Sequence, residues 1–161
     1  MKSYQLHGLE FQLPEAYQPS ETMITLRADA PDPGLPVMGR QLKVNPNLII
    51  HRRPAPKDRA VEMIAGEMMA EMAASIADME NLTTEAFDFR DNVPGIIIGF
   101  DFGAGQHARL RQFHALRVDD GTLTTSTLTV DAQTLNDSNK AEYLAILASP
   151  TPNGTSISGA S

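Results

Sequence analysis

The sequence predicts an α+β domain in which an antiparallel, twisted β-sheet packs against one long and one short α-helix. Residues 59–79 are rich in Ala, Met and Glu and contain no proline, which is typical of a long helix. Segments of β-type alternation come before this helix, and four more follow it with short turn signals between them. Strands joined by short turns pair antiparallel, and we expect the helices to cover one face of their sheet.

Each element is expected from a local signal. Apolar and polar residues alternate at 4–13, which indicates a short hairpin or strand pair. Prolines and glycines recur at 29–46, which indicates a loop at the sheet edge. Asp58 is suited to cap the long helix, because its carboxylate can accept the free N–H groups of the first turn. The remaining strands are expected at 22–27, 47–52, 84–90, 95–102, 109–118 and 123–130, and the short helix at 138–147.

The domain organisation is simple. With 161 residues and 42% hydrophobic composition, the chain fits one domain, expected at 1–149. Residues 150–161 are rich in Ser, Gly, Thr and Pro and are expected to form a disordered tail. The sequence has neither the apolar run of a signal peptide nor about 18 uninterrupted apolar residues, so we expect a cytoplasmic protein without stable membrane insertion.

Composition and motifs weigh against several function classes. The net charge of −7 disfavours nucleic acid as a partner, and the absence of Cys excludes disulfides and a cysteine nucleophile. The four histidines, at 7, 51, 107 and 114, lack the spacing of a metal site. Phosphate-binding loops and the G-x-S-x-G motif are also missing. We therefore expect no catalytic residue, no metal, no cofactor and no enzymatic activity.

The helix at 59–79 is the most informative feature. Five of the eight methionines lie on it, and its apolar residues extend over more than one face. A sheet covers only one face of a helix, so part of this surface needs another apolar neighbour. Two interpretations stay open: methionine fills gaps in a thick core, or it forms an adaptable apolar groove for a partner.

Short segments along the chain resemble the Eag chaperones of type VI secretion. These chaperones belong to the DcrB-like group, whose fold is similar to Mog1 and PsbP. The segments are Tyr4-Gln5-Leu6, Glu10-Phe11-Gln12-Leu13-Pro14, Met23-Ile24-Thr25-Leu26, Leu48-Ile49-Ile50-His51-Arg52 and Arg109-Leu110-Arg111-Gln112-Phe113. The element order agrees with that family over about residues 4–149, although the proline-rich insertion at 29–46 is longer than the family pattern.

This resemblance implies a function. Eag proteins are cytoplasmic homodimers that hold the hydrophobic N-terminal transmembrane helices of a secreted effector, of the Rhs or PAAR-containing kind, until it is loaded on the secretion spike. The implied groove residues in this chain are Ile24, Leu26, Ile49, Met68, Met72, Ile76, Ala108, Leu110 and Gln112. A transmembrane segment of about 20 apolar residues must be shielded from water, and Gln112 could satisfy its polar groups.

A second reading stays open beside this one. The protein could instead be a small non-enzymatic ligand-binding or regulatory module of the Mog1/PsbP-like class, in which the methionine helix is core. In that case it would have no affinity for hydrophobic helices.

Overall fold

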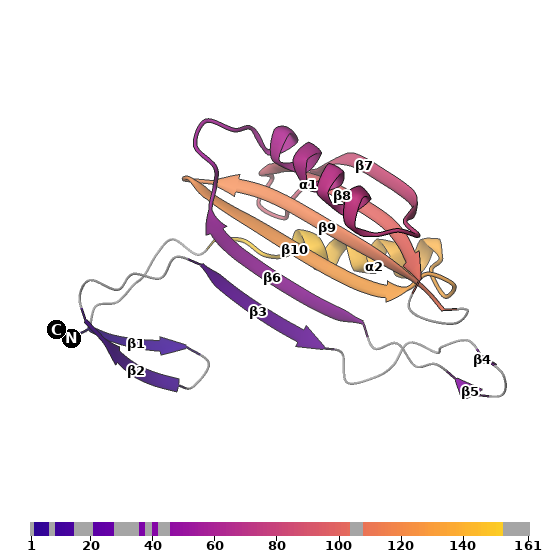
Figure 1. Ribbon diagram of the computed structural model, residues 1–161. Coiled ribbons are helices and arrows are strands. Elements are labelled where there is room, and N and C mark those ends of the chain that lie inside the picture. Colours follow the sequence, from indigo (N-terminus) through magenta and orange to yellow (C-terminus); the bar gives the residue numbers. More distant parts are fainter. Residues whose placement is uncertain are drawn as a thin grey trace.

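The computed structural model describes residues 2–6, 9–14, 21–27, 36–37, 40–41, 46–103 and 108–152 (Figure 1). Residues 153–161, most of the predicted tail, and most of the predicted loop at 29–46 lie outside the described residues. The elements are β1 (Lys2–Leu6), β2 (Leu9–Leu13), β3 (Thr22–Arg27), β4 (Pro36–Val37), β5 (Arg40–Gln41), β6 (Asn47–Pro54), α1 (Val61–Ser75), β7 (Glu80–Asp88), β8 (Pro94–Gly103), β9 (Arg109–Asp119), β10 (Thr122–Asp131) and α2 (Asp137–Ala148).

Six strands form one antiparallel sheet in the order β3-β6-β10-β9-β8-β7. The predicted meander from β7 to β10 is confirmed, and so is the predicted hairpin, which is the pair β1–β2. Within the segment predicted as a loop, β4 and β5 form a two-residue pair. The sheet with its long and short helix confirms the predicted α+β class.

The two helices lie on opposite faces of this sheet, so the expectation that both cover one face is wrong (Figure 1). On β9, Phe113 and Ala115 belong to the cluster beneath α2, whereas Leu116 belongs to the cluster beneath α1. Successive residues of a strand point to opposite faces, so both clusters draw on the same strands. Residues 113–117 are consequently all buried, because the centre of the sheet has no solvent-facing side.

The long helix is shorter at both ends than predicted. Asp58 does not cap it: the N-cap is Ala60, which offers no side-chain acceptor, and Asp58 has a φ of 57°. At the other end Ile76 is the extended C-cap. The Ser75 hydroxyl donates to the carbonyls of Glu71 (2.7 Å) and Met72 (3.3 Å), a local bond that competes with continuation of the helix.

The second helix begins with a capping box. The Asn136 side chain accepts hydrogen bonds from the backbone N–H groups of Ser138 and Asn139, and the Asn139 side chain accepts from the Asn136 N–H. These bonds satisfy amides that the first turn leaves free. The predicted short helix at 138–147 is thus confirmed within one residue at each end.

Candidate binding face

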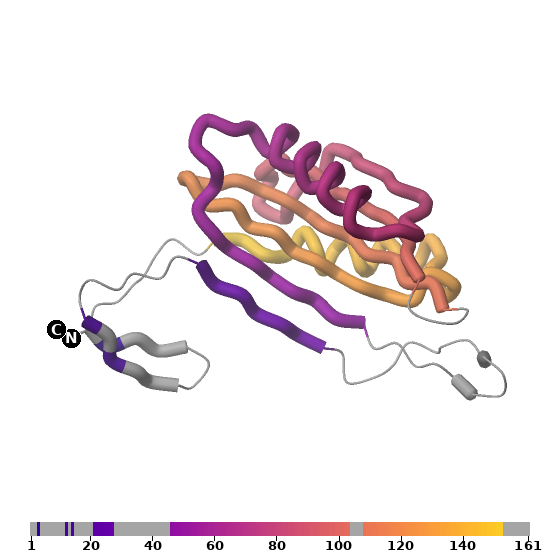
Figure 2. Tube along the Cα trace, viewed as in Figure 1, coloured from indigo at the N-terminus to yellow at the C-terminus, as the bar shows by residue number. Residues whose placement is uncertain are grey.

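The α1 helix packs mainly against β8 and β9, at one side of its sheet face. The strands β10, β6 and β3 extend beyond it on the same face (Figure 2). Strand register places alternate residues on this uncovered part, because directly paired residues share a face. We call it the open face, and it includes Met23, Thr25, Asn47, Ile49, His51, Thr125, Thr127 and Thr129 on these strands, together with Leu110 and Gln112 on the neighbouring strand β9.

The open face has an apolar component. Met23 is 62% exposed, and Ile49 and Leu110 are half-buried. Neither Ile49 nor Leu110 belongs to the two core clusters formed by the described residues. Their side chains are therefore partly accessible and lie outside both clusters.

Between these apolar positions runs a chain of polar side chains. The Gln112 amide Nε2 donates to the Thr129 hydroxyl (2.9 Å), which leaves its Oε1 to accept from His114 Nε2 (2.8 Å). The His114 Nδ1 is then the unprotonated nitrogen and accepts from the Thr127 hydroxyl (3.0 Å). The four groups form one directed network, which we call the polar chain.

The polar chain holds a buried, neutral histidine. His114 is 8% exposed, and its ring stacks on Phe100 with centroids 5.7 Å apart. Burial lowers the pKa of His114 to about 4, because an imidazolium loses its hydration there. The pattern of donors and acceptors is therefore fixed around neutral pH.

The structure brings only part of the predicted groove together. Ile49, Leu110 and Gln112 lie on the open face. Ile24 and Leu26 pair with Ile50 and Leu48, so they lie on the opposite face of the sheet.

The other predicted groove residues belong to α1 or to the start of β9. Met68 and Met72 on α1 and Ile76 at its end are partly buried against the cluster beneath this helix. Ala108 directly precedes β9 and is half-buried. Among the residues of α1, only Ile64 and Ala65 are buried, and Met63 is 56% exposed.

Sequence reasoning missed three members of the polar chain. His114 was weighed only as a metal ligand, and Thr127 and Thr129 were not singled out. The available signal was the alternation of threonine along 125–129, which places Thr125, Thr127 and Thr129 on one face of a strand. Gln112 is predicted to satisfy polar groups of a client helix, and its bonds to Thr129 and His114 leave only one amide N–H for that role.

Two further observations concern metals and membranes. In the part of the chain that the structure describes, no group of three or more His, Asp or Glu side chains could hold a metal ion. Neither of the described helices has the length and apolarity that crossing a membrane requires.

Comparison with known proteins gives a match at the level of structure. No protein-family model and no curated protein matches the chain. It is similar to a solved structure of PA94 from Pseudomonas aeruginosa, described as a protein of unknown function and putative regulator. The TM-score is 0.64 at 16% identity, over 96% of this chain and 99% of that one. A second similar structure is the PsbP protein (CyanoP) of Synechocystis sp. PCC 6803, with a TM-score of 0.44 and 18% identity over 91% and 88% of the chains. The PA94 match shows that the two proteins share a fold.

Proposed function

We propose that this protein is a non-enzymatic, cytoplasmic chaperone or adaptor that acts as a homodimer. Its client is the apolar N-terminal transmembrane region of a type VI secretion effector, as the resemblance to Eag chaperones implies. The open face is the proposed binding surface. The observation that carries the proposal is the hydrogen-bonded polar chain, which lies on β9 and β10 beside the apolar positions of the part of the sheet face that α1 leaves uncovered.

The apolar positions suit a transmembrane helix in water. Such a helix has about 20 apolar residues and must bury them before it reaches a membrane. Met23 and Ile49 lie on neighbouring strands of this face, and Leu110 lies across the polar chain from them. A helix laid along the face would contact both apolar sides.

The polar chain suits the polar groups of the same helix. Membrane helices associate through small residues and through hydrogen bonds from polar side chains. Within the polar chain, the second amide N–H of Gln112 and the hydroxyl hydrogen of Thr129 are not used, so two donors remain for a partner. Because the four groups of the polar chain bond to one another, they avoid the cost of being buried unpaired. Beside them, the Asn47 Oδ1 is buried without a hydrogen bond among the described residues.

Two substitutions on opposite faces test the binding surface. Ile49 and Ile24 are both half-buried isoleucines on neighbouring strands, but Ile49 lies on the open face and Ile24 on the other. We expect Ile49→Glu to abolish, and Ile24→Glu to preserve, co-purification of a co-expressed Lys-flanked helix of about 20 Leu, Ala and Gly residues. Light scattering gives the stoichiometry of the complex, and circular dichroism verifies the fold of each variant.

The outcomes separate the readings. If Ile24→Glu loses binding and Ile49→Glu retains it, the client binds to the opposite face of the sheet. Equal binding by both variants would refute the chaperone proposal at this sheet. Affinity capture from the native cells, followed by mass spectrometry, then identifies the effector.

The second candidate is a small non-enzymatic ligand-binding or regulatory module. One observation favours it: a cavity on the other face of the sheet is lined by Arg52, which has no ion pair among the residues that the structure describes. In that case wild-type protein binds no apolar helix, and the amides of α1 exchange slowly without any client.

A further inference from the structure

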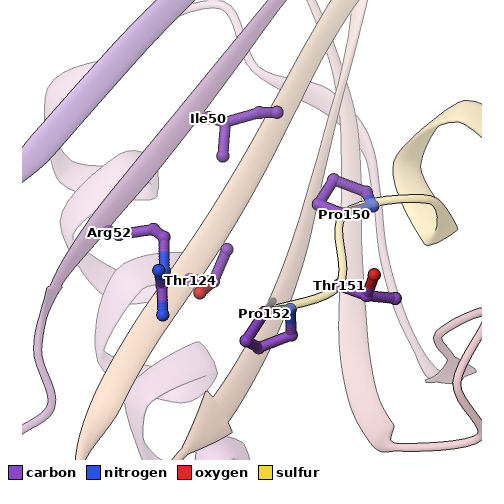
Figure 3. Close-up of a pocket in the computed structure, with 6 residues that line it drawn as sticks. All are labelled: Ile50, Arg52, Thr124, Pro150, Thr151 and Pro152. Carbon is purple, nitrogen blue, oxygen red and sulfur yellow. The ribbon is translucent and has the colours of Figure 1, made fainter. Parts of the chain in front are cut away.

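A small cavity lies on the face of the sheet that carries α2. Its volume is about 290 Å³, and it is bounded by β6, β10 and the segment that follows α2 (Figure 3). The lining residues are Ile50, Arg52, Thr124, Pro150, Thr151 and Pro152. The volume is near the lower limit of about 300–1,000 Å³ for ligand pockets, so any ligand is small.

One wall of the cavity is held by a buried ion cluster. Arg117 is 1% exposed and pairs with Asp91 (2.7 Å) and Asp119 (2.6 Å). Its Nη1 also donates to the Pro150 carbonyl (3.3 Å), and its guanidinium lies 4.8 Å from the Phe89 ring centre. Arg117 therefore fixes the start of the segment Pro150–Pro152 against the sheet, and the cavity exists before a ligand enters.

Arg52, the second arginine beside the cavity, has no such partners among the described residues. Thr124 pairs with Arg117 on one side and with Arg52 on the other, so the three residues share a face on adjacent strands. Arg117 is matched by two carboxylates, whereas Arg52 has no ion pair within the described ranges. Arg52 thus brings an uncompensated positive charge to the cavity.

The remaining lining residues define the ligand. Ile50 and the two prolines provide rigid apolar walls, and Thr124 and Thr151 provide hydroxyl groups (Figure 3). A guanidinium binds a carboxylate through two parallel hydrogen bonds. A single cation among apolar walls suits a monoanion with a short carbon body better than a phosphate dianion.

We infer that this cavity binds a small carboxylate with a short, branched apolar body. The carboxylate pairs with Arg52, the Thr hydroxyls donate to it, and the apolar body lies against Ile50 and the prolines. The site is on the opposite side of the sheet from the open face, so it is independent of the proposed chaperone function. The carboxylate can be that of a free metabolite or of an apolar residue at the C-terminus of a peptide.

The test is a titration followed by amide NMR shifts in the full chain. 3-Methylbutanoate is the probe, and 3-methylbutanamide is the uncharged control of the same shape. We expect saturable shifts at the amides of Ile50, Thr124 and Thr151 with a Kd in the range of about 1–10 mM for the carboxylate only. An Ac-Gly-Val peptide with a free C-terminus, compared with its C-terminal amide, separates the two sources of the carboxylate.

Two arginine variants give the matched comparison. Arg52→Gln should weaken binding about tenfold or more, since it removes a charge-assisted hydrogen bond. Arg53→Gln is the control, because Arg53 is the exposed neighbour on the opposite face of β6. Saturable binding that Arg52→Gln leaves unchanged would overturn the inference. So would equal shifts with the amide probe, or no saturation up to about 50 mM.

Discussion

Acidification from neutral pH to about pH 4 should destabilise this protein through His114. Burial lowers its pKa to about 4, whereas an unfolded-state histidine titrates near 6.5. Between these two values the unfolded chain binds a proton that the native chain does not, so the free energy of unfolding falls as the pH falls. The loss through His114 amounts to about 2 kcal/mol between pH 7 and pH 5 and approaches about 3 kcal/mol near pH 4.

The perturbation that isolates this effect is His114→Phe. The phenyl ring can keep the stacking on Phe100, but it leaves Thr127 and Gln112 without their shared partner, so we expect a loss of about 1–3 kcal/mol at pH 7. The diagnostic quantity is the change in unfolding free energy from pH 7 to pH 5. It should be about 2 kcal/mol smaller in the variant than in the wild type.

The assay is urea unfolding at both pH values, with Asn136→Ala as the control, because it removes a helix cap and no titratable group. The control should keep the wild-type pH dependence. A direct NMR titration of the His114 ring should give a pKa of about 4. An unchanged pH dependence in His114→Phe, or a ring that titrates near 6.5, would show that the histidine is not desolvated in the polar chain.

The remaining predictions concern stability and are measured by urea or thermal unfolding. Gly66→Ala should stabilise the protein by about 0.5–1 kcal/mol, because a Cβ there meets no atom and alanine favours the helix. Gly95→Ala should destabilise it by about 2 kcal/mol or more, since its Cβ would overlap the Leu116 carbonyl, and an equal effect of the two glycine changes would contradict this. Arg117→Met should cost about 2–4 kcal/mol, as two carboxylates lose their buried cation. Asn136→Ala should cost about 1 kcal/mol through the lost cap, and no change would mean that water caps the helix equally well.

The elements were predictable where the signal is local. The strands from β7 to β10 are bounded by turn residues, and two of these, Asn92 and Asp120, adopt the positive φ that turns require. The start of the short helix was equally predictable, since residues 136–138 are the cap-forming types Asn, Asp and Ser. The end of α1 was not predictable in this way, because apolar spacing continues through Ile76 and Met79, whereas the backbone becomes extended at Ile76, directly after Ser75 bonds back to the Glu71 carbonyl. Helix propensity alone does not locate this end.

The candidate site was predictable only in part, because the face of the sheet on which a strand residue lies depends on the register between strands. Ile24 and Ile49 were assigned to one groove, yet the pairing Ile24↔Ile50 puts them on opposite sides. A shift of one residue would reverse the assignment, and the long connection between β3 and β6 does not fix the register as a tight turn would. The polar chain was harder still, since its members come from β9 and β10 and meet only through the pairs His114↔Thr127 and Gln112↔Thr129.

Both proposed sites follow from the width of the sheet relative to its helices. Six strands about 4.8 Å apart span about 24 Å, whereas one helix with its side chains is about 10 Å across. A single helix on each face therefore covers about two strands, as α1 does with β8 and β9 and α2 with β9 and β10. The strands β6 and β3 extend past both helices, so Ile49 remains for a partner on one face and Arg52 on the other. Because the intervening sheet separates them, Ile49→Glu and Arg52→Gln should each leave the other site's binding unchanged, as expected for sites without shared contacts.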